Sequence, residues 1–323
     1  TAASDYSGAG EGAVEVEIPD GASGQEIGQI LYDKGVVASV GAFADAYAAN
    51  ANSGNIQAGV YTLKAKMSAA NAVAALLDPA SQTRRLTIPE GFTQAQVKEK
   101  LISTGGFTDA QVDAAFADTA GIGLPSAAGG HVEGWLAPDT YNISQGATAT
   151  EVVAEMVKRT VSRLKNAGVA EADYETVLIK ASIVEREATP TYYGQVARVI
   201  DNRLADTDGD TQGKLGMDST ILYGLGRSGG MPTQAELDDA SNPYNTRIHP
   251  GLPPTPIGSP GKGTITAVLN PPAGDWLYFV TINLDTGETR FASTYAEQQA
   301  NEQLLQQYCA ANEAKCSSGT HKS

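Results

Sequence analysis

The chain has 323 residues, with 22 lysines and arginines against 37 aspartates and glutamates, which gives a formal net charge of −15. This acidity argues against nucleic acid as the main partner, because nucleic-acid binding relies on Lys and Arg to neutralise phosphates. The same acidity excludes a polybasic anchor to a membrane surface. Hydrophobic residues make up 41% of the chain, which suffices for a folded core, and no run is long enough for a membrane-spanning helix.

The N-terminal part contains a motif that occurs twice, at residues 18–31 and 88–101. Each copy places a Pro-acid-Gly turn between a β-rich run and a helix start. Ser23 with Glu26, and Thr93 with Gln96, have the capping-box spacing, in which two side chains satisfy free amides at a helix N-terminus. The repeated pattern therefore predicts a strand, a turn and a capped helix, used twice.

Short helices are predicted over residues 37–49 and 68–77, and a strand over residues 60–64. Residues 13–83 are therefore expected to form a small α+β module. Residues 1–12, rich in Ala, Ser and Gly, are expected to be a flexible tether in front of it. Because the chain begins at Thr1, without Met or an apolar leader, we interpret it as a processed or truncated form.

The remaining chain is expected to form a mixed α+β domain over residues 84–312, followed by a mobile tail over residues 313–323. The predicted elements are helices from Thr108, over 148–166, 172–188, 192–205 and 294–312, and strands over 276–283 and 288–292. Residues 218–272 are rich in Gly and Pro and are expected to form one long, ordered loop. The length of the chain is consistent with such a two-part division.

The best candidate for chemistry is Glu185, in the predicted helix 172–188. At about 100° per residue, Glu185 falls within the apolar arc of that helix, where loss of hydration is expected to raise the pKa of its carboxyl. A general acid needs this property. The alternative is a buried Glu satisfied by Arg198 or Arg203 of the next helix. Glu187 lies outside the arc and is interpreted as a surface charge near Lys180.

The Gly/Pro-rich stretch offers candidate sugar contacts in Tyr223, Tyr244 and Asn245, whose rings and amide suit sugar surfaces. A rigid structural loop is the alternative. Other chemistries lack their motifs, since the chain has no P-loop, no nucleophile elbow and no His or Cys spacing typical of zinc. Carboxylate chemistry is therefore the leading hypothesis. Cys309 and Cys316 are either free thiols or a short-loop disulfide.

Six ordered segments resemble one known family. The heptapeptide Ala-Ser-Ile-Val-Glu-Arg-Glu at residues 181–187 is similar to a motif of the MltG (YceG-like) endolytic murein transglycosylases. The likeness continues through segments 133–141, 196–204, 218–224, 244–246 and 251–261, in the family's order. Four positions depart from the family's usual residues: Gly216-Met217, where a Gln and a small residue are common, Ser219 in place of Pro, and Thr255 in place of Gly.

The resemblance implies a LysM-like glycan-binding module followed by a YceG-like catalytic domain. It implies a lyase that cleaves MurNAc–GlcNAc bonds within nascent peptidoglycan strands and leaves 1,6-anhydroMurNAc ends, with no cofactor or metal. Its location would be the extracytoplasmic face of the membrane, anchored by an N-terminal helix absent from this chain, with cell-wall synthases as possible partners. Such a location also favours a Cys309–Cys316 disulfide. The residues that carry over are Glu185 as catalytic acid and Asp218, Tyr223, Tyr244, Asn245 and Thr246 as substrate contacts.

A lytic transglycosylase needs only one carboxyl group, because the C6 hydroxyl of MurNAc attacks its own anomeric carbon. Glu185 is expected to act first as the acid and then as the base. Two alternatives remain. One is a glycan-binding scaffold without catalysis, and the other is a glycoside hydrolase that uses a second carboxylate from Glu133, Glu187 or Asp218.

Overall fold

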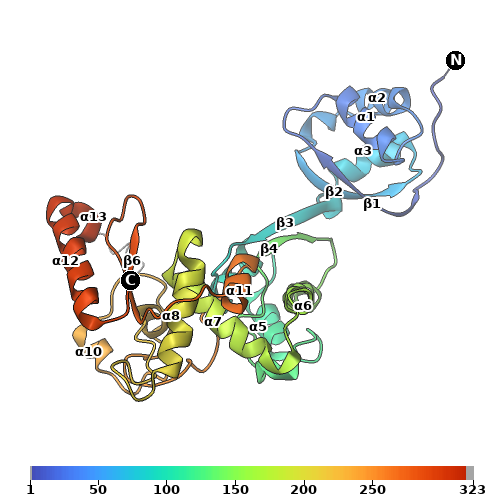
Figure 1. Ribbon diagram of the computed structural model, residues 1–323. Helices are drawn as coiled ribbons and strands as arrows, with labels where there is room; N and C mark the ends of the chain where they lie inside the picture. Colours follow the sequence, from blue (N-terminus) through green and yellow to red (C-terminus); the bar gives the residue numbers. More distant parts are fainter. Residues whose placement is uncertain (1, 318–323) are drawn as a thin grey trace. The chain divides into compact units, whose positions relative to one another are not determined.

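The chain folds into two units built from interleaved segments, seen in the computed structural model of Figure 1, which describes residues 2–317. The first unit consists of the chain up to residue 87 with 100–108 and 140–152, and the second of 88–99, 109–139 and the chain from 153 onward. The fold is mixed α+β, as predicted. The expected boundary between residues 83 and 84 falls inside a strand, β3 (Gln82–Ile88).

The first unit is built on a four-stranded sheet whose strands follow in sequence order. The strands are β1 (Glu11–Ile18), β2 (Gly59–Ala65), β3 and β4 (Asp139–Ile143), and the helices are α1 (Gly24–Asp33), α2 (Val40–Ala49) and α3 (Ala69–Leu77). Along β1, Val16 and Ile18 are buried while Glu15 and Glu17 are exposed, which is the alternation of a half-buried strand. The predicted capping box at the start of α1 is confirmed by reciprocal hydrogen bonds between Ser23 and Glu26.

The expected tether is attached to the first unit at three points. The Ser4 carbonyl accepts a hydrogen bond from the Ser39 hydroxyl at 2.6 Å, and the Asp5 carboxylate accepts one from the Ala69 N–H at 2.9 Å. The Gly8 carbonyl accepts from the Ser68 N–H, and residues 11 and 12 already belong to β1. The expectation of a free tether is therefore wrong between residues 4 and 12, because these groups bond the Ser39 hydroxyl at the start of α2 and two backbone amides at the start of α3.

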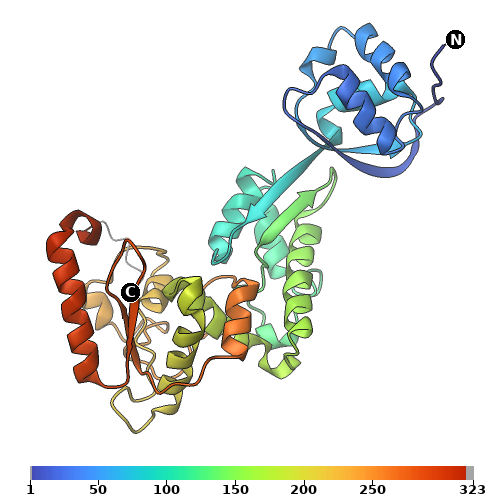
Figure 2. The same cartoon turned by 45° about the horizontal axis from the view of Figure 1, so that its top comes forward.

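The second unit is mainly helical. Two helices cross the division, α4 (Gln94–Ser103) and α6 (Ala149–Asn166), with residues 100–103 and 149–152 in the first unit. The other elements are α5 (Asp109–Ala117), α7 (Tyr174–Glu187), α8 (Tyr193–Ala205), α9 (Asp218–Gly224), α10 (Gln234–Leu237), α11 (Lys262–Leu269), β5 (Tyr278–Thr281), β6 (Thr289–Ala292), α12 (Tyr295–Ala311) and α13 (Glu313–Ser317). The central helix is α7, which packs against α8, α9 and α11. The antiparallel hairpin β5–β6 packs against α12, and Figure 2 shows the three side by side.

Two expectations for the C-terminal half are corrected. Residues 218–272 are not one loop, since they contain α9, α10 and α11. Gly and Pro on both sides of these short helices masked their pattern. The start of the expected mobile tail is also ordered, because residues 313–317 form α13, whereas 318–323 lie outside the described residues. The Cys309–Cys316 disulfide is confirmed and joins α13 to α12. Within the described chain, no helix is long and apolar enough to cross a membrane.

Candidate active site

A cavity of about 530 Å³ lies in the second unit, which is within the usual range of about 300–1,000 Å³ for ligand pockets. Its polar wall contains Glu187, Arg203, Asp218 and Arg247, and its aromatic wall contains Tyr278, Phe279 and Tyr295. The aromatic residues come from β5 and α12, and the polar residues from α7, α8, α9 and the segment after α10. Aromatic rings opposite acids and guanidinium groups form a surface suited to sugar rings with hydroxyl substituents.

Glu187, the last residue of α7, is the buried acid of this cavity. It is 4% exposed, and its Oε1 accepts a hydrogen bond from the Ser219 N–H at 3.3 Å. Burial raises the pKa of Glu187 to about 7, and the neighbouring charge of Asp218 acts in the same direction. The C-terminal end of a helix also disfavours a negative charge. The carboxyl is therefore poised to hold and release a proton near neutral pH.

The interpretation of Glu187 as a surface charge near Lys180 is wrong. Lys180 instead pairs with Asp201 at 2.9 Å. The polar arc of α7 is covered because α8, α9 and α11 surround the helix, and only its first turn and parts of one side stay open. A helical wheel separates an apolar arc from a polar arc, but it does not show which later helices will pack against the polar arc.

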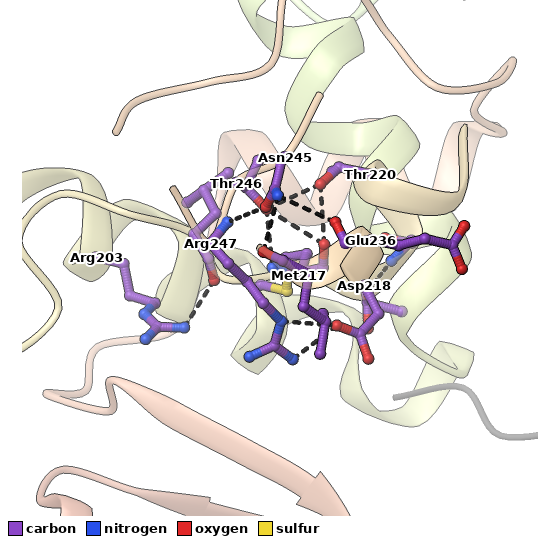
Figure 3. Close-up of polar contacts among 12 residues, drawn as sticks. Arg203, Met217, Asp218, Thr220, Glu236, Asn245, Thr246 and Arg247 are labelled. Carbon is purple, nitrogen blue, oxygen red and sulfur yellow. Dashed lines mark hydrogen bonds and ion pairs between the residues drawn. The ribbon is translucent and has the colours of Figure 1, made fainter. Parts of the chain in front are cut away.

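Beside Glu187, Asp218 and Arg247 form an ion pair. Arg247 donates to Asp218 Oδ1 from Nη2 at 2.6 Å and from Nε at 2.9 Å, and Figure 3 shows its guanidinium directed at that carboxylate. The Asp218 side chain is only 11% exposed, so this pair is better shielded from solvent than most surface pairs. Asp218, expected to contact the substrate, therefore lines the cavity but already has a cationic partner.

Arg203 contributes the second guanidinium of the cavity. Its Nη1 donates to the Leu215 carbonyl at 2.7 Å, and its guanidinium lies over the Tyr278 ring, 5.4 Å from the centroid. Figure 3 shows the side chain apart from the Asp218–Arg247 pair. The interpretation that Arg203 or Arg198 neutralises Glu185 does not hold, because Arg198 donates to the carbonyls of residues 271 and 272.

Glu185 is half-buried and belongs to a different cluster from the residues that line this cavity. Its carboxylate accepts hydrogen bonds from the Tyr193 hydroxyl at 3.2 Å, the Gly261 N–H at 3.1 Å and the Thr264 hydroxyl at 2.9 Å. Gly261 is the N-cap of α11 and has no side chain to satisfy the first amides of that helix. Glu185 bonds the N–H of this N-cap residue and the hydroxyl of Thr264, and so ties the start of α11 to α7.

A second carboxyl, that of Glu90, lies beside Glu185. Burial and the neighbouring charge of Glu185 raise the pKa of Glu90. Segments 90–92 and 258–261 are joined by hydrogen bonds from the Gly91 N–H to the Ser259 carbonyl and from the Ser259 N–H to the Phe92 carbonyl, both at 2.8 Å. A side chain at Gly261 would collide with Glu90. The surroundings of Glu185 therefore bring three segments together.

Tyr223 and Tyr244 form an edge-to-face pair with ring centroids 4.9 Å apart. The Tyr244 hydroxyl lies 2.7 Å from the Thr255 hydroxyl. Beside Tyr223 lies Glu133, which is 2% exposed and accepts a hydrogen bond from the Gln94 N–H at 2.8 Å. Burial raises the pKa of Glu133 to about 7. These residues form a polar cluster of their own, apart from the residues that line the cavity.

Asn245 and Thr246 are buried and form hydrogen bonds within the chain. The Asn245 amide donates to the Leu237 carbonyl at 3.0 Å and to the Asp239 carbonyl at 3.1 Å. The Thr246 hydroxyl lies 2.8 Å from that of Thr220, and Figure 3 shows both side chains turned into this network. Asn245 and Thr246 therefore stabilise the segment that carries Arg247.

A model of the YceG-like family matches residues 16–304. The chain belongs to the YceG-like family. It is 30% identical over 330 aligned residues to proteins named endolytic murein transglycosylase from Streptococcus pneumoniae serotype 2 (strain D39 / NCTC 7466) and from strain ATCC BAA-255 / R6. In each case the match covers 89% of this chain but only 57% of the relative, so this chain spans little more than half of their length.

A solved structure supports the same assignment. The crystal structure of a putative yceG-like protein from Listeria monocytogenes is 29% identical in sequence, with a TM-score of 0.55. The match covers 90% of this chain and 99% of that one. The likeness therefore extends over both units. No group of three or more His, Cys, Asp or Glu that could hold a metal ion occurs among the residues with described positions.

Proposed function

We propose that this chain is the catalytic part of an endolytic murein transglycosylase, a lyase that cuts peptidoglycan glycan strands with Glu187 as its general acid. The observation that carries this proposal is the position of the buried Glu187 carboxyl among the residues that line the 530 Å³ cavity, where burial raises its pKa. Family membership and the names of the pneumococcal relatives support the substrate class. Glu185, the candidate chosen from the sequence, is the second candidate acid.

The reaction requires one proton to be given and one to be taken back. The protonated Glu187 carboxyl donates to the glycosidic oxygen as the bond to the MurNAc anomeric carbon breaks. The C6 hydroxyl of the same MurNAc then attacks that carbon and releases its proton to the Glu187 carboxylate. The products are a GlcNAc with a free hydroxyl and a 1,6-anhydroMurNAc end, and no water is consumed. Because the attack is intramolecular, ring geometry supplies much of the orientation.

The remaining cavity residues would orient the sugars. Tyr278 and Tyr295 offer ring faces for stacking, and Arg203 and Arg247 offer hydrogen-bond donors for hydroxyl and carbonyl oxygens. Asp218 keeps the negative charge of its ion pair close to the anomeric carbon, where positive charge develops in the transition state.

A second candidate function is a glycoside hydrolase with two carboxyls, and the observation that favours it is the presence of both Glu187 and Asp218 in one cavity. In that case Asp218 would activate a water and the product would carry a reducing end. The Arg247 partner opposes this role, because two hydrogen bonds from its guanidinium already occupy Oδ1 of Asp218.

The deciding experiment compares Glu187→Gln and Glu185→Gln on defined, uncross-linked glycan strands, with the products identified by mass spectrometry. We expect anhydro ends from the wild type, loss of at least about 100-fold in cleavage rate for Glu187→Gln, and retained cleavage for Glu185→Gln. Loss of activity only in the Glu185 variant would return the acid role to Glu185. Reducing ends would instead establish the hydrolase.

The setting of the enzyme is also a proposal. A murein substrate places the reaction outside the cytoplasm, and the Cys309–Cys316 disulfide is consistent with an oxidising compartment. We infer a membrane anchor, glycan binding by the LysM-like residues 13–83, and contact with cell-wall synthases. Sedimentation with purified murein sacculi tests the glycan-binding part, with variants on the exposed faces of α1 and α2.

A further inference from the structure

Two groups of one residue, Ser219, face the Glu187 carboxyl. The Ser219 N–H donates to Glu187 Oε1 at 3.3 Å. The Ser219 side chain is 7% exposed, and its hydroxyl is one of few buried side-chain atoms in the described chain without a hydrogen-bond partner of good geometry. A buried hydroxyl that stays unpaired is costly. Its position beside the carboxyl points to a task there.

Ser219 is also held in place from both sides. Its neighbour Asp218 is fixed by Arg247, and its other neighbour Thr220 is fully buried, with its hydroxyl donating to the Met217 carbonyl at 2.9 Å. The backbone around Ser219 therefore has little freedom. A hydroxyl on such a fixed backbone can constrain the rotamer of a neighbouring carboxyl, whereas one on a flexible loop cannot.

We propose that Ser219 is the positioning residue of Glu187, with its hydroxyl and its main-chain N–H fixing the direction of the carboxyl toward the cavity. This inference rests on the proposed function, in which Glu187 delivers the proton. Rotation of a carboxyl about its terminal bond exchanges its two oxygens. A donor that holds one oxygen opposes this exchange and leaves the other oxygen free to carry the reacting proton.

Several charged or titratable groups surround Glu187, and they act in opposite directions. Burial and the charge of Asp218 raise the pKa of Glu187, whereas the Ser219 hydroxyl, the Ser219 N–H and the charge of Arg186 lower it. The other titratable groups that line the cavity are Arg203 of α8, Arg247, Tyr278 of β5, and Tyr295 and Glu302 of α12. Removing the hydroxyl alone leaves all these charges in place.

The experiment uses Ser219→Ala in the whole chain, with Ser182→Ala as the matched control. Ser182 is also a buried serine, and its hydroxyl bonds to the Ile179 carbonyl and accepts from the Ile257 N–H. We expect the alkaline limb of the kcat/KM profile to move to higher pH by about half a unit to one unit in Ser219→Ala, the size expected for one lost hydrogen bond. Ser182→Ala should not move it.

A carbon-13 titration of the Glu187 carboxyl by NMR gives a readout that does not depend on catalysis. The same upward movement of its midpoint is expected in Ser219→Ala and, to a smaller degree, in Ser219→Cys, which serves if the alanine variant does not fold. An unchanged midpoint in both variants would overturn the proposal while leaving Glu187 as the acid. Full activity of Glu187→Gln would instead refute the proposed function, and the titration would still decide whether Ser219 binds the carboxyl.

Discussion

Replacing Glu187 with Gln is expected to make the protein more stable at neutral and alkaline pH. The ordinary pKa of a glutamate is 4.5, and burial raises that of Glu187 to about 7 in the folded chain. A carboxyl with a raised folded pKa favours the folded state most when it is protonated, so its contribution is present below pH 4.5 and is lost as the pH rises toward 7. Above pH 7 the ionised, buried carboxylate penalises the folded state by its full amount.

The size of this penalty follows from the two pKa values. One unit corresponds to about 1.4 kcal/mol, so a rise from 4.5 to about 7 gives about 3 kcal/mol at pH 8. A glutamine of the same shape carries no charge and still accepts the hydrogen bond from the Ser219 N–H. Glu187→Gln should therefore match the wild type near pH 4 and exceed its free energy of unfolding by about 3 kcal/mol at pH 8.

Urea denaturation followed by circular dichroism, at unit steps from pH 4 to pH 8, measures this difference. The wild-type curve alone is not sufficient, because burial also raises the pKa values of Glu133 and Glu175 to about 7. Glu133→Gln is the matched variant, since its carboxyl is equally buried but lies apart from the cavity residues. A Glu187→Gln advantage that stays constant from pH 4 to pH 8 would refute the reasoning, because it would mean that the buried carboxyl is not ionising in this range.

Three further outcomes are expected. Glu185→Ala, which removes the hydrogen bonds to Gly261 and Thr264 at the start of α11, should lower the free energy of unfolding by about 1–2 kcal/mol, measured by urea denaturation. Arg247→Ala leaves Asp218 unpaired beside Glu187, so the alkaline limb of the pH–rate profile should move upward, and an unmoved limb would remove the pair from the electrostatics of the acid. Reduction of the Cys309–Cys316 bond should lower the melting temperature measured by calorimetry, with the double Cys→Ser variant insensitive to reductant.

Local sequence signals predicted most of the helices and strands. The capping boxes at Ser23 and Thr93 mark helix starts because the hydrogen bonds they form lie within four residues of each other. The hairpin β5–β6 was predicted from its turn for the same reason. The pairing of β3 with β4 had no such signal, because the two strands are separated by about 50 residues of other elements and sheet partners at that distance leave no periodic trace.

The candidate site was less accessible to sequence reasoning. Asn245 is a residue that suits either a sugar hydroxyl or a backbone carbonyl, and only the position of segment 237–239 shows that it binds carbonyls. Arg247 belongs to no motif, and Arg203, inside segment 196–204, was considered only as a partner of Glu185. The burial of Glu187 could not be predicted from its own helix. The packing that buries this side chain comes from α9, which begins 31 residues further along the chain.

The two glutamates near the end of α7 illustrate how one rigid helix can serve two tasks. Residues two positions apart on a helix point about 200° away from each other, so Glu185 and Glu187 must face nearly opposite sides. Glu185 binds the start of α11, and Glu187 enters the cavity beside α9. The bond to α11 therefore fixes the rotation of α7 about its own axis, and that rotation decides where the Glu187 carboxyl points. Glu185→Gln keeps a side-chain oxygen that can accept the hydrogen bonds from the Gly261 N–H and the Thr264 hydroxyl, so α7 should keep its rotation and cleavage should be retained in that variant.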